Sequence, residues 1–266
     1  GMYPKTGKLP ADPAVFPCCA GVLDLVYNPR RTALLLRAEE LGIPCAGGLS
    51  MLVAQAKAAE ELFFGRPIPD TEIERILGRM SRDMQNIVLI GMPGSGKTTI
   101  GAALSRLSGR EVIDLDEQIV RETGVSIPAL FAGSGEAAFR ALERGQAERW
   151  GKEGGKVLVC GGGIVKDERN YASLKQNGRV YQIERDVSLL EREGRLLSAN
   201  ADLPAMLRER APFYERFRDV AVANDGSAEE TARRIWEEYN AYSDFERAES
   251  EPVGSARTGH LRKTDV

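Results

Sequence analysis

Residues 91–98 read Gly-Met-Pro-Gly-Ser-Gly-Lys-Thr, which fits the phosphate-loop pattern G-x-x-x-x-G-K-[ST]. The apolar run 87–90 before this loop is typical of a buried strand, and an expected helix begins at its end. Glycines allow the loop to turn its N–H groups toward an anion, and the helix directs its positive dipole end to the same point. The alternative is a glycine-rich turn that binds nothing. The strand and helix on either side favour binding of a nucleoside triphosphate.

The loop also predicts how the phosphates and a Mg²⁺ ion are held. Lys97 offers a positive charge to the β- and γ-phosphates, and the Thr98 hydroxyl is a candidate Mg²⁺ ligand. The residues expected at the phosphates of ATP are Gly94, Ser95, Gly96, Lys97, Thr98 and Thr99.

Two carboxylates, Asp114 and Asp116, follow the next expected strand. The carboxyl end of a neighbouring parallel strand lies beside a phosphate loop, so both side chains are expected near the phosphates. One carboxylate there is suited to a place near Mg²⁺, and the other to accepting a proton from an attacking hydroxyl. The alternative is that both acids only stabilise the N-terminus of a helix.

From residue 85 onward, expected strands alternate with expected helices. Strand-like runs lie at 86–90, 111–115, 156–160, 179–183 and 220–224. Helical patterns lie between them and after the last one, at 135–150, 202–217 and 227–242. Pro212 lies inside the second long helical pattern, where we expect a kink or a break. The alternation predicts an α/β fold with a doubly wound parallel sheet. We therefore expect one domain over 85–242, followed by a disordered tail at 244–266.

The first 82 residues carry a separate set of patterns. An apolar run at 21–27 predicts a strand, and helical patterns follow at 33–41 and 51–64. Ser50 is the expected cap of the second of these helices. We interpret residues 1–82 as a unit distinct from the one that contains the phosphate loop.

Composition excludes several classes of function. The net charge of −3 argues against a chain that wraps nucleic acid or coats an anionic membrane. No apolar run approaches the ~20 residues that span a bilayer, so we expect no membrane partner. None of the four cysteines forms a C-x-x-C pair, and His260 is the single histidine, so zinc and imidazole chemistry are not expected. This composition favours a reduced, cytoplasmic protein.

Six segments in a fixed order resemble the shikimate kinase family. They are GMPGSGKT (91–98), DLDEQI (114–119), IPALFAGSGEAAFRALE (127–143), VCGGGIV (159–165), GRLLS (194–198) and RERAPFY (208–214). The joint match covers about residues 85–242 and is far more specific than any one segment. It implies a P-loop fold of the nucleoside-monophosphate-kinase type. It also implies transfer of the γ-phosphoryl group of MgATP to the 3-hydroxyl of shikimate, a reaction of chorismate and aromatic amino-acid biosynthesis.

The resemblance implies roles for three residues next to the loop. Asp114 would lie near the Mg²⁺ ion, whereas Asp116 would bind the shikimate hydroxyls and act as the base toward the attacked one. Gly162, in the triple glycine, would offer its backbone N–H to the substrate. A triple glycine after a buried strand does allow close approach of backbone and ligand.

The resemblance also implies that Arg140 and Arg210 hold the shikimate carboxylate. A guanidinium group suits bidentate recognition of a carboxylate, in agreement with this role. The alternative for Arg140 is an ordinary helix ion pair with Glu136 or Glu143. Arg208 competes with Arg210 for the second position, and only the motif register separates them.

A short segment at 194–204 resembles the closing lid of the family. Arg195 in this segment would contact ATP and stabilise charge on the transferring phosphoryl group, with Arg192 as the rival residue. The family often has proline where this chain has Leu196. Loss of that proline frees the backbone, so we expect altered kinetics of closure and unchanged chemistry.

The N-terminal segment resembles the C-terminal part of shikimate dehydrogenase. The matching stretches are GMYP (1–4), DLVYNPRRTALLLRA (24–38) and GGLSMLVAQAKAAEELFFG (47–65). The resemblance implies that Tyr27 and Gln55 approach shikimate, and that Gly48 and Met51 lie near the nicotinamide of NADP. The alternative is that these side chains only pack or face solvent.

The dehydrogenase part is expected to be inactive by itself. This chain contains neither a glycine-rich dinucleotide fingerprint before the N-terminal segment nor the upstream catalytic Lys and Asp of that family. NADP would bind only if that missing part were present. We interpret the chain as a fragment of a dehydrogenase–kinase fusion in which the kinase is intact.

Two other functions remain open from the sequence. One is a different P-loop small-molecule kinase, such as a gluconate or nucleotide kinase. The other is a non-catalytic nucleotide-binding module. Asp116 with Arg140 and Arg210 favours a carboxylated polyol as substrate, with shikimate and ATP as the two ligands. The sequence leaves the oligomeric state open.

Overall fold

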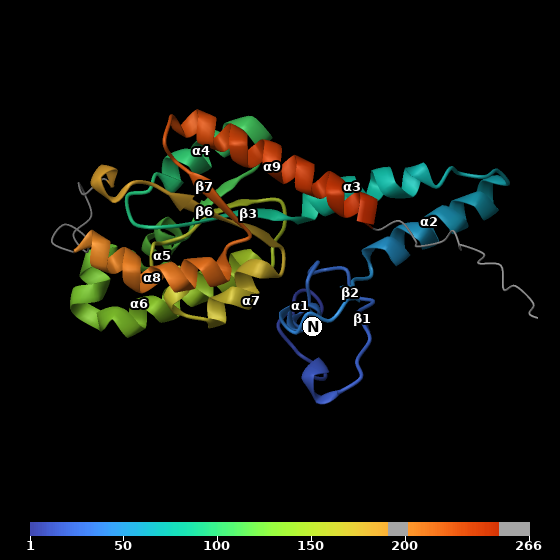
Figure 1. Ribbon diagram of the computed structural model, residues 1–266, viewed down its shortest axis with the longest axis horizontal. Coiled ribbons are helices and arrows are strands. Elements are labelled where there is room, and N and C mark those ends of the chain that lie inside the picture. Colours follow the sequence, from blue (N-terminus) through green and yellow to red (C-terminus); the bar gives the residue numbers. More distant parts are fainter. Residues whose placement is uncertain (191–201, 250–266) are drawn as a thin grey trace, which may run out of the picture.

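The computed structural model describes residues 1–190 and 202–249, and its centre is a five-stranded parallel sheet (Figure 1). The strands, in spatial order, are β4 (Val112–Asp114), β5 (Val157–Val159), β3 (Asn86–Ile90), β6 (Gly178–Glu184) and β7 (Val220–Ala223). Val88 of β3 is in register with Leu158 of β5 on one side and with Val180 of β6 on the other. The predicted α/β fold with a doubly wound parallel sheet is confirmed.

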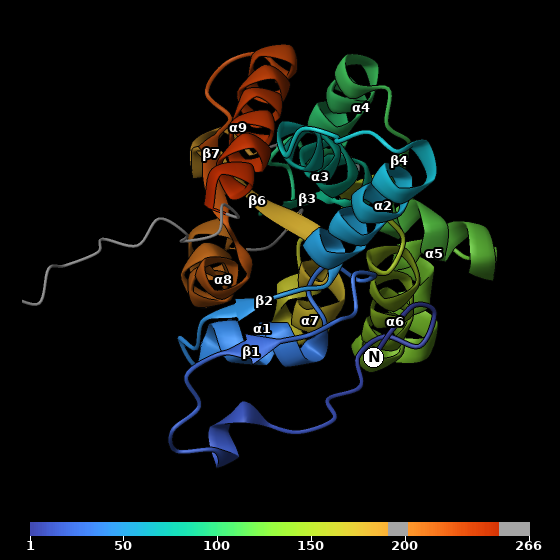
Figure 2. The same ribbon diagram turned by 90° about the vertical axis from the view of Figure 1, so that its right-hand side faces the viewer.

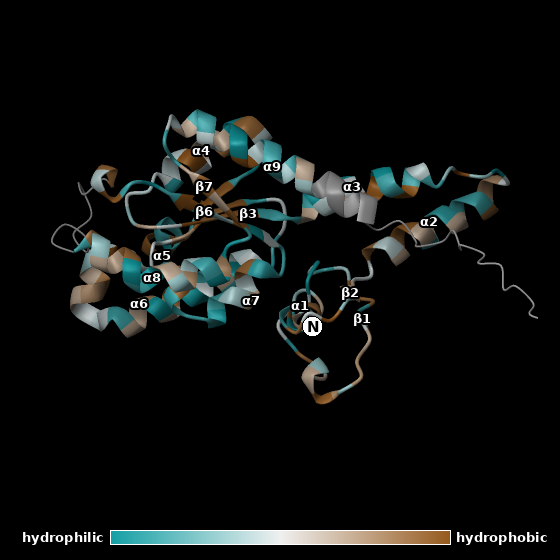
Figure 3. Ribbon diagram, viewed as in Figure 1, coloured by the Kyte–Doolittle hydropathy of each residue, from teal (hydrophilic) through white to brown (hydrophobic). Residues whose placement is uncertain are grey.

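Apolar residues of β3 face both sides of the sheet, which explains the uninterrupted apolar run in the sequence. Ile87 and Leu89 pack with α4 (Lys97–Ser108) and α9 (Ala228–Glu249). Val88 and Ile90 pack with α7 (Arg169–Lys175), α8 (Leu203–Phe217) and the end of α6 (Ile127–Gly151). Figure 2 shows these two helical layers on opposite sides of the sheet, and Figure 3 shows the hydrophobic strands between them.

A smaller apolar cluster joins α5 (Leu115–Thr123) to α6 at one end of the sheet. Ile119 of α5 packs there against Leu130 and Phe139 of α6. The sequence predicted a helix only from residue 135, but the chain is helical from Ile127, with a break at Gly135 (φ 78°, ψ 170°). The break divides α6 into two helical sections that meet beside the functional site.

The N-terminal segment forms a small unit beside this sheet. Its elements are a 3₁₀ turn η1 (Pro13–Val15), β1 (Val22–Leu23), α1 (Ala33–Glu40), β2 (Cys45–Ala46), α2 (Leu49–Phe64) and α3 (Thr71–Met84). β1 and β2 pair in parallel, and α2 and α3 lie side by side as a hairpin (Figure 1). Backbone hydrogen bonding joins this unit to the region before β6, where Arg31 N donates to Gln176 O at 2.9 Å.

Several expected boundaries were wrong. Ser50 does not cap α2: the helix begins at Leu49 and its N-cap is Gly48. Pro212 does not split α8, which runs from Leu203 to Phe217 with the proline inside it. The last helix does not end near residue 242: α9 continues to Glu249, so it includes the first residues of the expected tail, 244–249. The rest of the expected tail, 250–266, lies outside the described residues.

Two 3₁₀ turns complete the described chain, η2 (Ile164–Lys166) after β5 and η3 (Val187–Leu189) after β6. Within residues 1–190 and 202–249, no helix combines the length and the apolar character needed to cross a membrane.

Glycines on α6 provide a matched test of this packing. A Cβ at Gly151 would lie 2.0 Å from the Ser173 carbonyl oxygen of α7, whereas a Cβ at Gly145 would meet no described atom within 4 Å beyond its chain neighbours and the backbone of its own helix. We expect Gly151→Ala to lower the free energy of unfolding by about 2 kcal/mol through overpacking. Gly145→Ala is expected to raise it by roughly 0.5–1 kcal/mol, because alanine favours a helix interior over glycine. Urea titration measures both, and equal effects would contradict the α6–α7 contact.

Candidate active site

The phosphate loop runs from the end of β3 to the start of α4 with an unusual backbone. Gly91, Gly94 and Gly96 have φ of 144°, 83° and 93°, a region that residues with a Cβ rarely adopt. A Cβ at Gly91 would lie 2.5 Å from the Ile183 carbonyl oxygen, so the loop passes directly over β6. The N-cap of α4 is Gly96, which leaves the first N–H groups of the helix to face the loop.

Asn224, at the carboxyl end of β7, holds this loop through a side-chain hydrogen bond to its backbone. Its Nδ2 donates to the Ser95 carbonyl oxygen at 2.8 Å, and its Oδ1 accepts from the Thr231 hydroxyl at 3.1 Å. Its backbone N donates to Glu184 O at 2.6 Å. The sequence analysis missed the role of this residue, and its only signal was a polar side chain at the end of the last expected strand, 220–224.

Lys97 lies within the loop and is almost fully buried. Its Nζ donates to the carbonyl oxygens of Gly91 and Met92, both at 2.9 Å, and lies 3.5 Å from Ser95 Oγ. The ammonium group is therefore held at the concave side of the loop, where anionic phosphates would be attracted.

Thr98 and Asp114 bring oxygen ligands together beside the loop. The Thr98 hydroxyl donates to Asp114 Oδ2 at 3.1 Å, while Asp114 Oδ1 accepts from the backbone N of Asp116 at 3.0 Å and caps α5. No group of three His, Cys, Asp or Glu residues with metal-binding geometry occurs within the described ranges. A hydroxyl with one carboxylate fits Mg²⁺, which takes few protein oxygens and keeps several waters, and does not fit a zinc site.

A cavity of about 270 Å³ opens next to the loop, and seven of the residues predicted for the kinase site line it. Its lining includes Lys97, Thr98, Asp114, Asp116, Arg140, Gly162 and Arg210. Arg208, the rival of Arg210, is exposed. Four predicted phosphate contacts are not among the lining residues found in the described chain: Gly94, Ser95, Gly96 and Thr99. Arg192, Arg195 and Leu196 lie outside the described residues.

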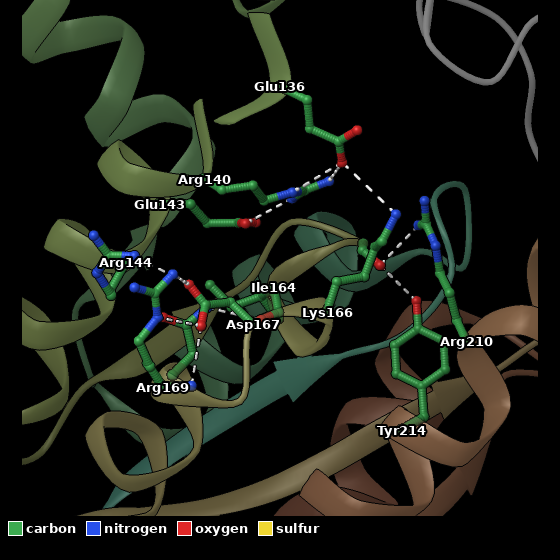
Figure 4. Close-up of polar contacts among 12 residues, drawn as sticks. Glu136, Arg140, Glu143, Arg144, Ile164, Lys166, Asp167, Arg169, Arg210 and Tyr214 are labelled. Atoms are coloured by element: carbon green, nitrogen blue, oxygen red, sulfur yellow. Dashed lines mark hydrogen bonds and ion pairs between the residues drawn. The ribbon is translucent and has the colours of Figure 1, made fainter. Parts of the chain in front are cut away.

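The triple glycine after β5 forms one wall of this cavity. A Cβ at Gly161 would lie 2.7 Å from Asp116 Oδ1 and 2.9 Å from Glu143 Oε1. Both carboxylates therefore pack against the backbone of Gly161, where a larger residue would displace them. The Gly162 carbonyl oxygen accepts from Arg210 Nη1 at 2.9 Å and from the Tyr214 hydroxyl at 2.7 Å (Figure 4). These two bonds fix α8, and with it the Arg210 guanidinium, against the cavity wall.

Arg140 makes both of the helix ion pairs that the sequence allowed. Its Nη1 donates to Glu143 Oε2 at 2.6 Å, and its Nη2 donates to Glu136 Oε1 at 3.0 Å (Figure 4). Burial lowers the pKa of Arg140, but the two carboxylates outweigh burial and raise the pKa above its ordinary value. The guanidinium therefore stays charged at the edge of the cavity.

Glu143 is a buried carboxyl whose importance the sequence analysis did not recognise. Its side chain has no exposed area, and among the described residues its Oε1 has no hydrogen-bond partner. Burial raises the pKa of Glu143 to about 7, although the charge of Arg140 opposes the shift. The spacing of Phe139, Arg140 and Glu143 was the available signal, but burial depends on how α6 packs and is not visible in that spacing.

The residues predicted to form a dehydrogenase site lie in the N-terminal unit, and none of them is among the lining residues of this cavity. Gly48 N donates to Val26 O at 3.1 Å, which brings the start of α2 next to Tyr27. A Cβ at Gly48 would lie 2.0 Å from Leu25 O, so only glycine fits there. Tyr27, Met51 and Gln55 are exposed.

A parallel α/β sheet with a glycine-rich phosphate loop and an acidic, arginine-lined cavity defines a P-loop phosphotransferase fold. The family model described as shikimate kinase matches residues 93–240. The chain belongs to the shikimate kinase family.

Individual relatives agree with this assignment. The shikimate kinase of Thermobifida fusca is 38% identical over 166 residues, which cover 59% of this chain and 96% of that protein. The match to the shikimate kinase of Nitrosomonas europaea is 46% identical over 95 residues but spans only 45% of that protein's length. The solved shikimate kinase of Acinetobacter baumannii, in complex with shikimate, has a TM-score of 0.58 and 30% identity, and covers 62% of this chain and 98% of its own.

The buried carboxyl of Glu143 predicts a pH-dependent stability. The pKa of Glu143 is about 7 in the folded protein and near 4.5 in the unfolded chain. Below pH 4.5 the carboxyl is protonated in both states and its burial costs no ionisation energy, whereas at higher pH the unfolded state gains stability by ionising first. Wild-type stability relative to Glu143→Gln is therefore expected to fall as the pH rises from 4.5 to about 7, by about 1–3 kcal/mol. Urea unfolding of both proteins across this range measures the difference. A difference that stays flat or changes in the opposite direction would contradict the buried, uncompensated carboxyl.

Proposed function

We propose that this chain transfers the γ-phosphoryl group of ATP to the 3-hydroxyl of shikimate. The observation that carries the proposal is a single cavity shared by the end of the phosphate loop, Asp116 and two arginines. A phosphate-binding loop and a carboxylate-binding pair opening into one space suit transfer from a nucleotide to a small hydroxy acid.

Each side of the cavity has its own proposed role. The loop with Lys97 holds the terminal phosphates, and its fixed N–H groups and ammonium stabilise charge that develops there. Thr98 and Asp114 are the residues that would hold Mg²⁺. When bound, this ion neutralises phosphate charge and orients the phosphates for transfer.

The opposite side is proposed to bind and activate shikimate. Arg140 and Arg210 take the carboxylate, and the backbone N–H of Gly162 contacts the substrate. Asp116 orients the hydroxyls and accepts a proton from the attacking oxygen as the bond to phosphorus forms. Arg195 is the proposed lid residue that contacts the phosphates.

Other P-loop kinases remain less favoured. The chain belongs to the shikimate kinase family, and the A. baumannii enzyme of that family was solved with shikimate bound. A coupled assay of ADP release across shikimate, gluconate and nucleoside monophosphates tests the choice. We expect turnover with shikimate, and turnover with only the other substrates would reject the proposal.

The proposed base is tested by Asp116→Asn. We expect phosphoryl transfer to shikimate to fall by about a hundredfold or more, because the amide cannot accept the proton. Binding of MgATP, measured by calorimetry, is expected to persist because Asp116 lies outside the phosphate loop. Asp83→Asn, a change of the same kind at an exposed side chain of α3, serves as the control and should leave turnover intact. Undiminished transfer in Asp116→Asn would exclude the base assignment.

For the N-terminal unit we propose kinship with the C-terminal part of shikimate dehydrogenase, with Tyr27, Gly48, Met51 and Gln55 at the remnant of its site. The parallel pairing of β1 with β2 and the close approach of Gly48 to Leu25 support a piece of a parallel α/β domain. A two-stranded parallel sheet leaves such a site open to solvent. We expect no NADPH-dependent reduction of 3-dehydroshikimate by this chain, and spectrophotometric detection of NADPH oxidation would contradict that expectation.

A further inference from the structure

Glu136 lies one helical turn before Arg140 on α6 and occupies one edge of its guanidinium group (Figure 4). Arg140 Nε and Nη2 both donate to Glu136 Oε1, at 3.2 and 3.0 Å. The remaining Nη1 donates to the buried Glu143 at 2.6 Å. A Cβ at Gly163 would lie 2.4 Å from Arg140 Nη2 and 2.5 Å from Nη1. The edge of the guanidinium made by these two nitrogens therefore lies against the Gly163 backbone.

A carboxylate ligand binds a guanidinium best through two parallel N–H groups on one edge. The edge made by Nε and Nη2 is the one that Glu136 takes. Of the two carboxylates on Arg140, Glu143 has no exposed area whereas the Glu136 side chain is 53% exposed. An incoming carboxylate is therefore expected to displace Glu136 and to leave the Arg140–Glu143 pair in place.

We propose that Glu136 is an internal competitor of the substrate carboxylate for Arg140, and that its displacement sets the affinity for shikimate. The inference rests on the proposed function, in which Arg140 binds that carboxylate. Glu136 thus lowers affinity for the acid substrate, and it also keeps the guanidinium oriented while the cavity holds no acid.

A second cationic side chain, Lys166, lies beside Glu136. Lys166 Nζ of η2 lies 3.7 Å from Glu136 Oε1 (Figure 4). The same Nζ lies 3.4 Å from Glu209 Oε1. Glu136 therefore retains a cationic neighbour after it leaves Arg140, which reduces the cost of its displacement.

The backbone next to Glu136 also permits the change. Gly135 breaks α6 with φ 78° and ψ 170°, so Glu136 begins the second helical section and is not held by a continuous helix. A Cβ at Gly135 would meet no described atom within 4 Å beyond the adjacent residues and the backbone of its own helix, so no other segment packs against this position. A glycine in this conformation changes its dihedral angles at low steric cost.

The test compares KM for shikimate in the full chain and in Glu136→Gln. We expect KM to decrease by about twofold to fivefold, the range set by a partly exposed ion pair, with kcat and KM for ATP unchanged. Glu136→Ala, which removes the competing group entirely, is expected to lower KM at least as much. An unchanged or higher KM in both variants would overturn the proposal and assign Glu136 a purely positioning role.

A matched control separates competition from a general change of charge. Glu209→Gln removes the same charge at a carboxylate that also contacts Lys166 but makes no recorded ion pair with Arg140 among the described residues. We expect it to leave KM for shikimate nearly unchanged, and a decrease equal to that of Glu136→Gln would overturn the inference.

A substrate without the acid group provides a second readout. The methyl ester of shikimate cannot compete with Glu136 for the charged edge, so Glu136→Gln should not improve its KM. An equal improvement with the ester and the acid would contradict competition.

If the wild-type chain fails to phosphorylate shikimate at all, the proposed function fails. If it does so and Glu136→Gln leaves KM unchanged, only the present inference fails.

Discussion

β3 pairs in parallel with β5 on one side and β6 on the other, and all five strands of the sheet point the same way. Their carboxyl ends therefore meet at one edge. The phosphate loop follows β3, Asp114 ends β4, the triple glycine follows β5 and Asn224 follows β7. Residues far apart in the sequence share one cavity because of this single arrangement, which depends on apolar strands buried on both faces.

Charge balance is the second feature that shapes the site. Arg140 lies between a buried carboxylate, Glu143, and a partly exposed one, Glu136. The buried partner has a pKa raised by desolvation, whereas a hydrogen bond from Arg140 lowers the pKa of Glu136. The two carboxylates thus differ in burial and in pKa although both are about one turn from the arginine. One fixes the guanidinium within the protein, and the other occupies the edge that a ligand would use.

Much of this site was predictable because its motifs are local. The loop needs glycines at fixed positions, and the strand before it and the helix after it are visible as periodic patterns in the sequence. The register of the family motifs was enough to select Arg210, which lines the cavity, over the exposed Arg208. The roles of these residues remain predictions, as do those of Arg195 and Leu196 in the segment that the structure does not describe.

Features that depend on tertiary packing were not predictable. Asn224 braces the loop only because β7 ends beside it, and nothing near residue 224 in the sequence reveals that contact. The burial of Glu143 follows from how α6 lies on the triple glycine. Ser50 matched the preferences of a helix cap, yet α2 starts earlier, because Gly48 is held against Leu25 and Val26 by a close backbone approach. Local propensity gave way there to a contact across the chain.

The central claim is that the phosphate loop and the arginine-lined cavity act on two ligands in one reaction. Phosphorus NMR of the purified chain with ATP, Mg²⁺ and shikimate tests it most directly, since it observes the fate of the phosphoryl group. The account predicts that the γ-phosphate signal of ATP is replaced by ADP and a phosphomonoester signal in equal amounts. ADP with inorganic phosphate alone, or unchanged ATP, would contradict it.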